Sequence, residues 1–297
     1  MKKRTIGMIV YFLTGAALLT AGFATTEKGL KEDDRKEYER VIEDRKELGD
    51  LGFPGFSPLD YKTAFSNGEK DFVIDYRNGE MEITEREAVY EGLVGSIYPN
   101  GDEYEVVVPV YETWIATGAH EQLSAVIWHE SFHAYQNSCF RLAENSADNG
   151  LSETELAERI DRDPEKRSLY EKELEVLGRV ADTDKTCDFR QTALEYLRIA
   201  EKRDELLSAE EKISEDYYEL SEGSACYVES RVVRYENGDA VYEDNYLKNA
   251  ASYAEGNSKY YHHGMLQCML LDGLDPEWKS TFAFDCSLDD VIARYCE

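Results

Sequence analysis

The stretch that decides how this chain folds reads Trp128-His129-Glu130-Ser131-Phe132-His133-Ala134-Tyr135-Gln136. Two of the five histidines in the chain stand four residues apart in this stretch, at His129 and His133. Residues at that spacing lie on one face of a helix, so both imidazoles can reach a single ion. The stretch therefore predicts a helix, from about His120 to Asn137, that binds one Zn²⁺ ion.

Glu130 completes the pattern His-Glu-x-x-His, which is the signature of zinc peptidases. A carboxylate beside the ion can take a proton from the attacking water, so Glu130 is the predicted general base. The alternative is a chance match, because glutamate is common in this chain and only histidine is scarce.

A catalytic zinc ion usually has three protein ligands, so two histidines leave the predicted site one ligand short. His120 lies nine residues before His129, on or near the same helix, and cannot easily fold back to the ion. The third ligand must then be an Asp or a Glu from elsewhere. Glu222 is the best candidate and Glu219 the second choice, and the alternative is that both belong to a solvated acidic helix.

Glu222 opens the sequence Glu-Gly-Ser-Ala-Cys-Tyr-Val-Glu229. With the His-Glu-x-x-His helix, this sequence resembles the gluzincin metallopeptidases, and more closely the alanyl-aminopeptidase type, whose motif is Glu-Gly-x-Ala-x-Tyr-x-Glu. The resemblance implies that Glu222 is the third zinc ligand. Tyr261-x-x-Gly264 is similar to the Tyr-x-x-Gly of that group, which implies that the Tyr261 hydroxyl stabilises the oxyanion. The alternatives are Tyr260, about 100° round the helix, and a tyrosine that only packs.

Two neighbours of these residues complete the predicted site. Gly223, directly after Glu222, would let another backbone approach this turn closely. His262 and His263, directly after Tyr261, could assist the oxyanion or contact substrate. The favoured interpretation is a pair of ordinary, partly exposed histidines.

The resemblance has two departures. His133 and Glu222 are 89 positions apart, far more than in alanyl-type aminopeptidases, so the helices from about 150 to 210 look like an insertion. The Gly-x-Met-Glu-Asn motif of those enzymes is not present as such, and Gly79-Glu-Met-Glu-Ile83 matches it only in part. The sequence therefore leaves open whether the chain is an endopeptidase or an exopeptidase.

The composition supports a folded protein and excludes some partners. Of 297 residues, 42% are apolar and 12% aromatic, which is enough for a large core. The formal charge of −29 argues against nucleic acid and anionic membrane surfaces as partners, because phosphate binding needs basic patches.

The first residues predict export. Basic residues at positions 2 to 4 precede a mostly apolar, uncharged segment from Ile6 to Ala24. Residues 1–24 are therefore predicted to be a signal peptide or an N-terminal anchor that tethers the chain to a membrane through residues 5–24. The protein would then be extracytoplasmic, either secreted or anchored.

All cysteines lie after this segment, at Cys139, Cys187, Cys226, Cys268, Cys286 and Cys296. An even number in an exported chain predicts disulfides, and the alternative is free, buried thiols.

The predicted fold is α+β and zincin-like. Residues 25–50 form a leader and a first helix, and 51–297 form the metallopeptidase domain. Within it, 51–116 are a small antiparallel sheet lobe and 117–297 a larger helical lobe with an insertion between the His-Glu-x-x-His helix and the glutamate-ligand helix. The strand at 104–111 contains Pro109, which suits an edge strand that could pair with an extended peptide. The alternative is an edge strand without a ligand.

The sequence thus predicts an exported or membrane-tethered zinc metallopeptidase that acts on a peptide or protein substrate. The alternative from another class is a non-catalytic extracytoplasmic binding or structural protein that keeps a zincin-like fold. The complete set of His129, Glu130, His133, Glu222 and Tyr261 argues against lost activity, because a non-catalytic descendant has no need of a general base. An acidic exported chaperone or inhibitor is a third option, without a positive feature in its favour.

Overall fold

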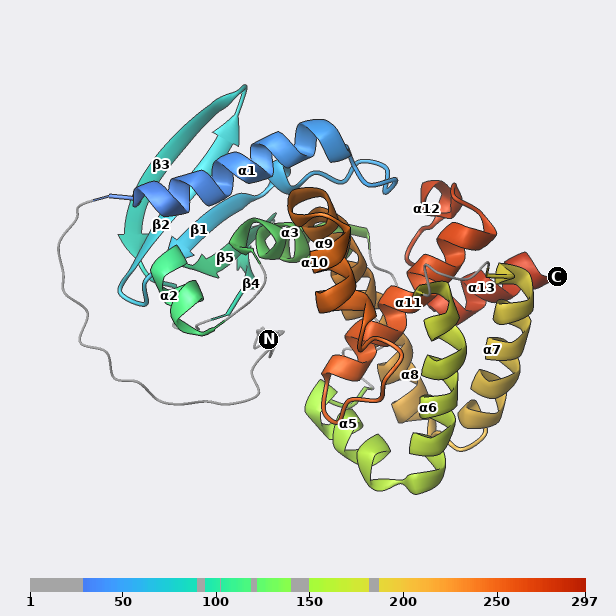
Figure 1. Cartoon of the computed structure of the whole chain (residues 1–297). Coiled ribbons are helices and arrows are strands. Elements are labelled where there is room, and N and C mark those ends of the chain that lie inside the picture. Colours follow the sequence, from blue (N-terminus) through green and yellow to red (C-terminus); the bar gives the residue numbers. More distant parts are fainter. Residues whose placement is uncertain (1–28, 90–93, 102, 119–121, 140–149, 182–186) are drawn as a thin grey trace. The chain divides into compact units, whose positions relative to one another are not determined.

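The computed structural model describes residues 29–89, 94–101, 103–118, 122–139, 150–181 and 187–297. The chain is an α+β protein, as predicted, and it divides into two compact units. The first unit consists of the described chain up to Gly49 together with Ser57–Ala134. The second unit consists of Asp50–Phe56 and Tyr135–Glu297. The first carries the sheet and the second is helical (Figure 1). Helix α3, Leu123–Cys139, begins in the first unit and ends in the second.

The sheet of the first unit has five strands in the order β3-β2-β1-β5-β4. Their bounds are β1 Lys62–Ser66, β2 Lys70–Arg77, β3 Glu80–Glu87, β4 Ser96–Asn100 and β5 Glu103–Pro109. All neighbouring pairs are antiparallel except β1 and β5, which are parallel. The prediction of an antiparallel sheet is therefore wrong, and the sheet is mixed. The chain between β1 and β5 contains three further strands, which is long enough to bring β5 back in the direction of β1.

Strand β5 lies between β1 and β4, so the prediction of an edge strand at 104–111 is wrong. The edges are β3 and β4. Pro109 is tolerated inside the sheet because it ends its strand. The backbone N–H of Val110 donates to the carbonyl of Ser66 at 2.9 Å, so the missing N–H of Pro109 costs the β1–β5 pairing no hydrogen bond there.

Two residues that favour tight turns connect β2 and β3. Asn78 and Gly79 join β2 to β3, and both have positive φ, 54° and 84°. This conformation at two central residues is the one that a two-residue hairpin requires. The partial motif Gly79–Ile83 consequently lies at the start of β3, at the edge of the sheet opposite to β4.

Helix α1, Glu32–Leu48, packs on the sheet of the first unit (Figure 1). It buries Tyr38, Val41 and Ile42, which form one apolar face of the helix. The ring of Tyr38 meets that of Tyr76 in β2 edge to face, with centroids 6.5 Å apart. The sheet therefore gains a covering layer on the face that carries Tyr76.

Two acidic side chains of α1 hold the starts of the next helices. Asp34 accepts a hydrogen bond of 2.6 Å from the backbone N–H of Tyr111, the first residue of α2, Tyr111–Ala116. Glu37 accepts one of 3.2 Å from the backbone N–H of Ser124 in the first turn of α3. Both donors belong to helix starts, whose N–H groups lack partners within the helix. The position of α3 in the first unit is thus tied to α1.

The second unit is built from helices. They are α5 Glu153–Arg162, α6 Pro164–Leu177, α7 Phe189–Asp204, α8 Ala209–Tyr218, α9 Ser224–Asn237, α10 Asp239–Tyr242, α11 Ser258–Leu274, α12 Trp278–Thr281 and α13 Leu288–Cys296. Short turns of helix are η1 Pro58–Asp60 in the first unit and η2 Gly178–Ala181, η3 Glu219–Gly223 and η4 Glu243–Leu247 in the second. Ser152 and Ser208 are the N-caps of α5 and α8, and their side chains accept from the backbone N–H of Glu155 and Glu211.

The short segment Asp50–Phe56 belongs to the helical unit because of its aromatic contacts. Phe53 is buried against Trp278 and Phe284, with ring centroids 5.8 and 6.1 Å away. Tyr135, in the last turns of α3, donates its hydroxyl to the carbonyl of Pro54 at 3.0 Å. The C-terminal end of α3 is therefore anchored inside the helical unit.

All six cysteines lie in the described part of the chain, and each is a free thiol. The structure thus has thiols where disulfides were predicted. Cys226 and Cys268 are buried in the core of the helical unit, and burial raises the pKa of Cys268. The sulfur of Cys226 is 3.9 Å from that of Met265, so it packs as a small apolar side chain.

None of the helices within the described ranges is both long and apolar enough to cross a membrane. The predicted signal peptide or anchor, residues 1–24, lies outside these ranges, as does His120.

Candidate metal centre

His129 and His133 lie one turn apart on α3, and both are buried. Their rings converge: the two Nε2 atoms are 3.0 Å apart and the ring centroids 4.7 Å. Two imidazoles that bind zinc at about 2.0–2.1 Å in tetrahedral geometry have their nitrogens about 3.3 Å apart. The pair therefore has close to the separation that a shared zinc ion needs.

Glu222 lies in the π-helical turn η3 and is also buried. His129, His133 and Glu222 each offer one ligand atom, and these atoms all lie within 4.8 Å of one another. Among the described residues, this is the one group of three or more His, Cys, Asp or Glu side chains that could hold a metal ion. The structure therefore brings together the three ligands predicted from sequence. Two imidazole nitrogens and one carboxylate oxygen are a donor set that suits catalytic zinc.

Glu219, the second choice for this ligand, is occupied elsewhere in the helical unit. Its Oε1 atom is 3.0 Å from Nδ1 of His263 and accepts a hydrogen bond of 3.3 Å from the Tyr170 hydroxyl. Its Oε2 atom accepts one of 3.2 Å from Gln267. Both carboxylate oxygens thus have partners within the fold, and Glu222 remains the ligand candidate.

The turn that carries Glu222 packs directly on α11 through two glycines. A Cβ atom at Gly223 would lie 2.3 Å from the Cα of Gly264, and one at Gly264 would lie 2.0 Å from the carbonyl oxygen of Glu219. No side chain fits at either position, which confirms the close backbone approach predicted at Gly223. Tyr261 is buried on α11 one turn before Gly264. The two motifs that carry Glu222 and Tyr261 therefore meet through their glycines.

Gln136 fixes the same turn from the side of α3, and sequence reasoning missed this role. Its Nε2 atom donates to the carbonyl of Ser221 at 2.9 Å and to Oγ of Ser224 at 2.8 Å. These two residues flank Glu222 and Gly223. Gln136 follows His133 by three residues, so it lies on nearly the same face of the helix. This spacing from His133 was the sequence feature that could have indicated the role of Gln136.

Glu130, the predicted general base, is buried on α3 next to His129. Its carboxylate lies against the backbone of Gly95, the residue directly before β4. Sequence reasoning did not single out Gly95, because nothing in its local sequence indicates which helix it touches.

Glu153, the first residue of α5, is a second acid near Glu222 that the sequence did not indicate. Burial, and after it the charge of Glu222, raise the pKa of Glu153 to about 9, although a hydrogen bond from Asn257 opposes the shift.

His263 lies inside a buried ionic network of the helical unit, so the partly exposed position predicted for it is wrong. In addition to Glu219, its Nε2 atom is 3.4 Å from Oε2 of Glu173 in α6. Burial alone would lower the pKa of His263, but the two carboxylates outweigh it and raise the pKa to about 10. His263 is thus a structural group whose charged form is favoured by its two carboxylate neighbours. His262 is partly exposed, as predicted.

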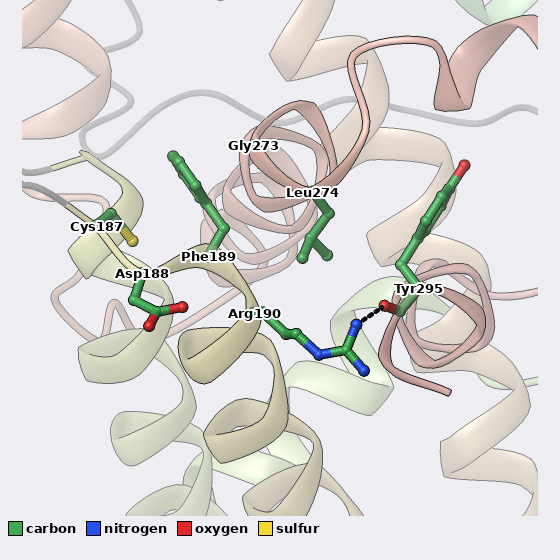
Figure 2. A pocket seen from close by; sticks show the side chains of 7 residues that line it. All are labelled: Cys187, Asp188, Phe189, Arg190, Gly273, Leu274 and Tyr295. Atoms are coloured by element: carbon green, nitrogen blue, oxygen red, sulfur yellow. Dashed lines mark hydrogen bonds between the residues drawn. The ribbon is translucent and has the colours of Figure 1, made fainter.

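A pocket of about 560 Å³ lies elsewhere on the helical unit (Figure 2). It is lined by Cys187, Asp188, Phe189, Arg190, Gly273, Leu274 and Tyr295. Its charged groups already serve the fold: Arg190 donates to the carbonyls of Tyr295 and Cys296 at 3.3 and 2.9 Å, and Asp188 caps α7. None of the predicted metal ligands or catalytic residues lines this pocket.

The chain was compared with protein-family models, curated proteins and solved structures, and none of them matches it. The buried group of His129, His133 and Glu222, with Glu130 beside it, therefore carries the functional conclusion by its own chemistry.

Proposed function

We propose that the protein is a zinc-dependent metallopeptidase with a zincin-like fold, exported or tethered to a membrane by its N-terminal segment. The observation that carries the proposal is the convergence of His129, His133 and Glu222 on one point, with the carboxylate of Glu130 on the same helix. Zinc bound there would act as a Lewis acid, which would lower the pKa of a water molecule and polarise the scissile carbonyl.

The residues of the chain then have separate roles. Glu130 takes the proton of the attacking water and later gives it to the leaving amine. Tyr261 donates its hydroxyl to the oxygen that becomes negative in the transition state. Gln136 and the Gly223–Gly264 contact hold the turn of Glu222 in place. This division of labour needs no further cofactor.

Strand β4 is the proposed place of the peptide substrate, in place of the strand predicted from sequence. It is an edge of the sheet among the strands that the structure describes, and the outer side of such an edge can pair with an extended chain. The strand follows Gly95, which touches Glu130. A peptide paired with the start of β4 would therefore pass close to the general base.

Metal analysis and one substitution test the proposal. The purified protein should contain about one zinc ion per chain. Glu130→Gln should keep this zinc and lower the cleavage of a mixed peptide library by about 10²-fold or more, because it removes general-base catalysis. In the same assay, Tyr261→Phe should lower kcat more than Tyr260→Phe does. The matched control is Glu80→Gln, an exposed glutamate at the far edge of the sheet.

Other results of the same experiments would contradict the proposed metallopeptidase. A protein without zinc, or zinc-loaded protein that cleaves no peptide, would favour the non-catalytic binding or structural protein. Full activity of Glu130→Gln would rule out the mechanism even if zinc is present.

A further inference from the structure

We propose that Gly95 is a positioning residue, which sets the place of the Glu130 carboxylate because only a residue without a side chain fits against it. The catalytic consequence rests on the proposed function, whereas the contact itself does not. Gly95, Val126 and Glu130 all lie in the sheet-bearing unit.

The space at Gly95 is already filled by the side chains of α3. A Cβ atom built on Gly95 would lie 2.7 Å from Oε1 of Glu130, 2.9 Å from Cγ of Glu130 and 2.9 Å from Cγ1 of Val126. Ordinary contacts between such atoms are about 3.5–4.0 Å. A single methyl group at this position would therefore overlap the carboxylate of the general base.

Backbone conformation does not explain the glycine. Many glycines of this chain stand at positive φ, for example Gly101 at 69°, where other residues are strained. Gly95 is not among them, so an alanine could adopt its backbone conformation. What position 95 requires is the absence of a side chain.

The carboxylate is the part that would yield to an added methyl group. The backbone after Gly95 is held by the sheet, where Ser96 pairs with Val107 of β5. Val126 and Glu130 stand one turn apart in the regular helix α3, which cannot retreat locally. The Glu130 side chain ends in rotatable bonds, so it would shift by most of an ångström. A misplacement of about 1 Å can cost about 10²-fold in rate.

The same backbone segment therefore has two tasks. It begins the edge strand β4, and it fixes the position of the base on α3. Under the proposed function, the contact at Gly95 thus fixes the position of the Glu130 carboxylate relative to β4, where the substrate binds.

The first test uses protein treated with a chelator and needs no activity. Gly95→Ala, Glu130→Ala and the double variant are compared by urea unfolding. Gly95→Ala should raise the unfolding equilibrium constant of the wild-type protein by some factor. In the Glu130→Ala background that factor should be smaller, by at least about fivefold, because removal of the Glu130 side chain relieves the overlap. Equal effects in the two backgrounds would overturn the inference. If Gly95→Ala does not fold, folding of the double variant supports the inference and its failure overturns it.

The second test uses the zinc-loaded enzyme. Gly95→Ala should lower kcat by about 10–100-fold, with zinc content and KM unchanged, because the base is displaced while the metal is held. Val126→Ala provides the matched control: it makes room on the other side of the added methyl group and should not restore kcat. Recovery of kcat in Gly95→Ala/Val126→Ala, or full kcat in Gly95→Ala, would overturn the inference and leave the proposed function standing. If the wild-type enzyme is inactive, the proposed function fails and the unfolding comparison still decides the contact.

Discussion

At the scale of single residues, Glu219 and Glu222 show how position within one turn decides the role of a carboxylate. Both are buried in η3, and both are close to a histidine. Glu219 is held by His263, Tyr170 and Gln267, so its charge is compensated within the fold. Glu222 belongs to the group with the two histidines of α3. Only Glu222 should therefore affect metal binding.

A matched pair of isosteric substitutions tests this difference. Glu222→Gln should weaken zinc binding by at least about 100-fold, since the loss of even an outer-shell partner costs about 10–100-fold. Glu219→Gln should leave zinc affinity within a few-fold of wild type, because its carboxylate does not join the group. Competition with a chromophoric chelator measures both affinities. The reverse pattern would make Glu219 the ligand.

At the scale of secondary-structure elements, one buried arginine joins three helices of the helical unit. Nε of Arg203 in α7 donates to both carboxylate oxygens of Glu173 in α6, at 2.8 and 2.7 Å, and its Nη1 atom donates to Glu215 in α8. All three side chains are almost fully buried. Paired charges of this kind are costly to separate because a lone buried charge has no solvent around it.

Arg203→Leu should consequently destabilise the protein by about 3–5 kcal/mol, because it removes the guanidinium that both Glu173 and Glu215 contact inside the core. Arg179→Leu is the control, since Arg179 pairs with Glu195 through two hydrogen bonds at the surface. That exposed pair should contribute only about 0–1 kcal/mol. Urea unfolding of both variants gives the two values. Equal losses would contradict the structural role of the network.

At the scale of the whole molecule, buried titrating groups link stability to pH. The pKa of His263 is about 10 in the folded chain, against 6.5 for the free side chain. Burial, only partly offset by Arg203, raises the pKa of Glu215 from 4.5 to about 8. In both cases the folded chain binds more protons than the unfolded chain between the two values. The free energy of unfolding must therefore fall as pH rises through these windows.

We expect this fall in a series of urea unfolding curves between pH 6.5 and 10. His263→Gln should flatten the curve across this range, since its proton no longer contributes. His262→Gln is the control: burial lowers the pKa of His262, so its contribution is confined to pH below 6.5. An unchanged slope in His263→Gln would mean that His263 is neutral in the folded protein.

Features of the protein that depend on residues close together in the sequence could be predicted, whereas features that depend on distant residues could not. Helix α1, the turn at Asn78 and Gly79, and the caps at Ser152 and Ser208 are local, so a few adjacent residues decide them. The spacing of His129 and His133 is local in the same way, because the helix repeat places both on one face. The sequence alone therefore determined the helix that carries His129 and His133, together with the place of Glu130 between them.

The tertiary structure decided everything that depends on distant partners. The parallel pairing of β1 with β5, and hence the edge position of β4, depends on the route of the chain through three other strands. The contact of Gly95 with Glu130 joins residues that are far apart in sequence. The choice of Glu222 over Glu219 depends on what each carboxylate meets in three dimensions. Local patterns carry no information about such contacts, because packing sets them after the helices and strands have formed.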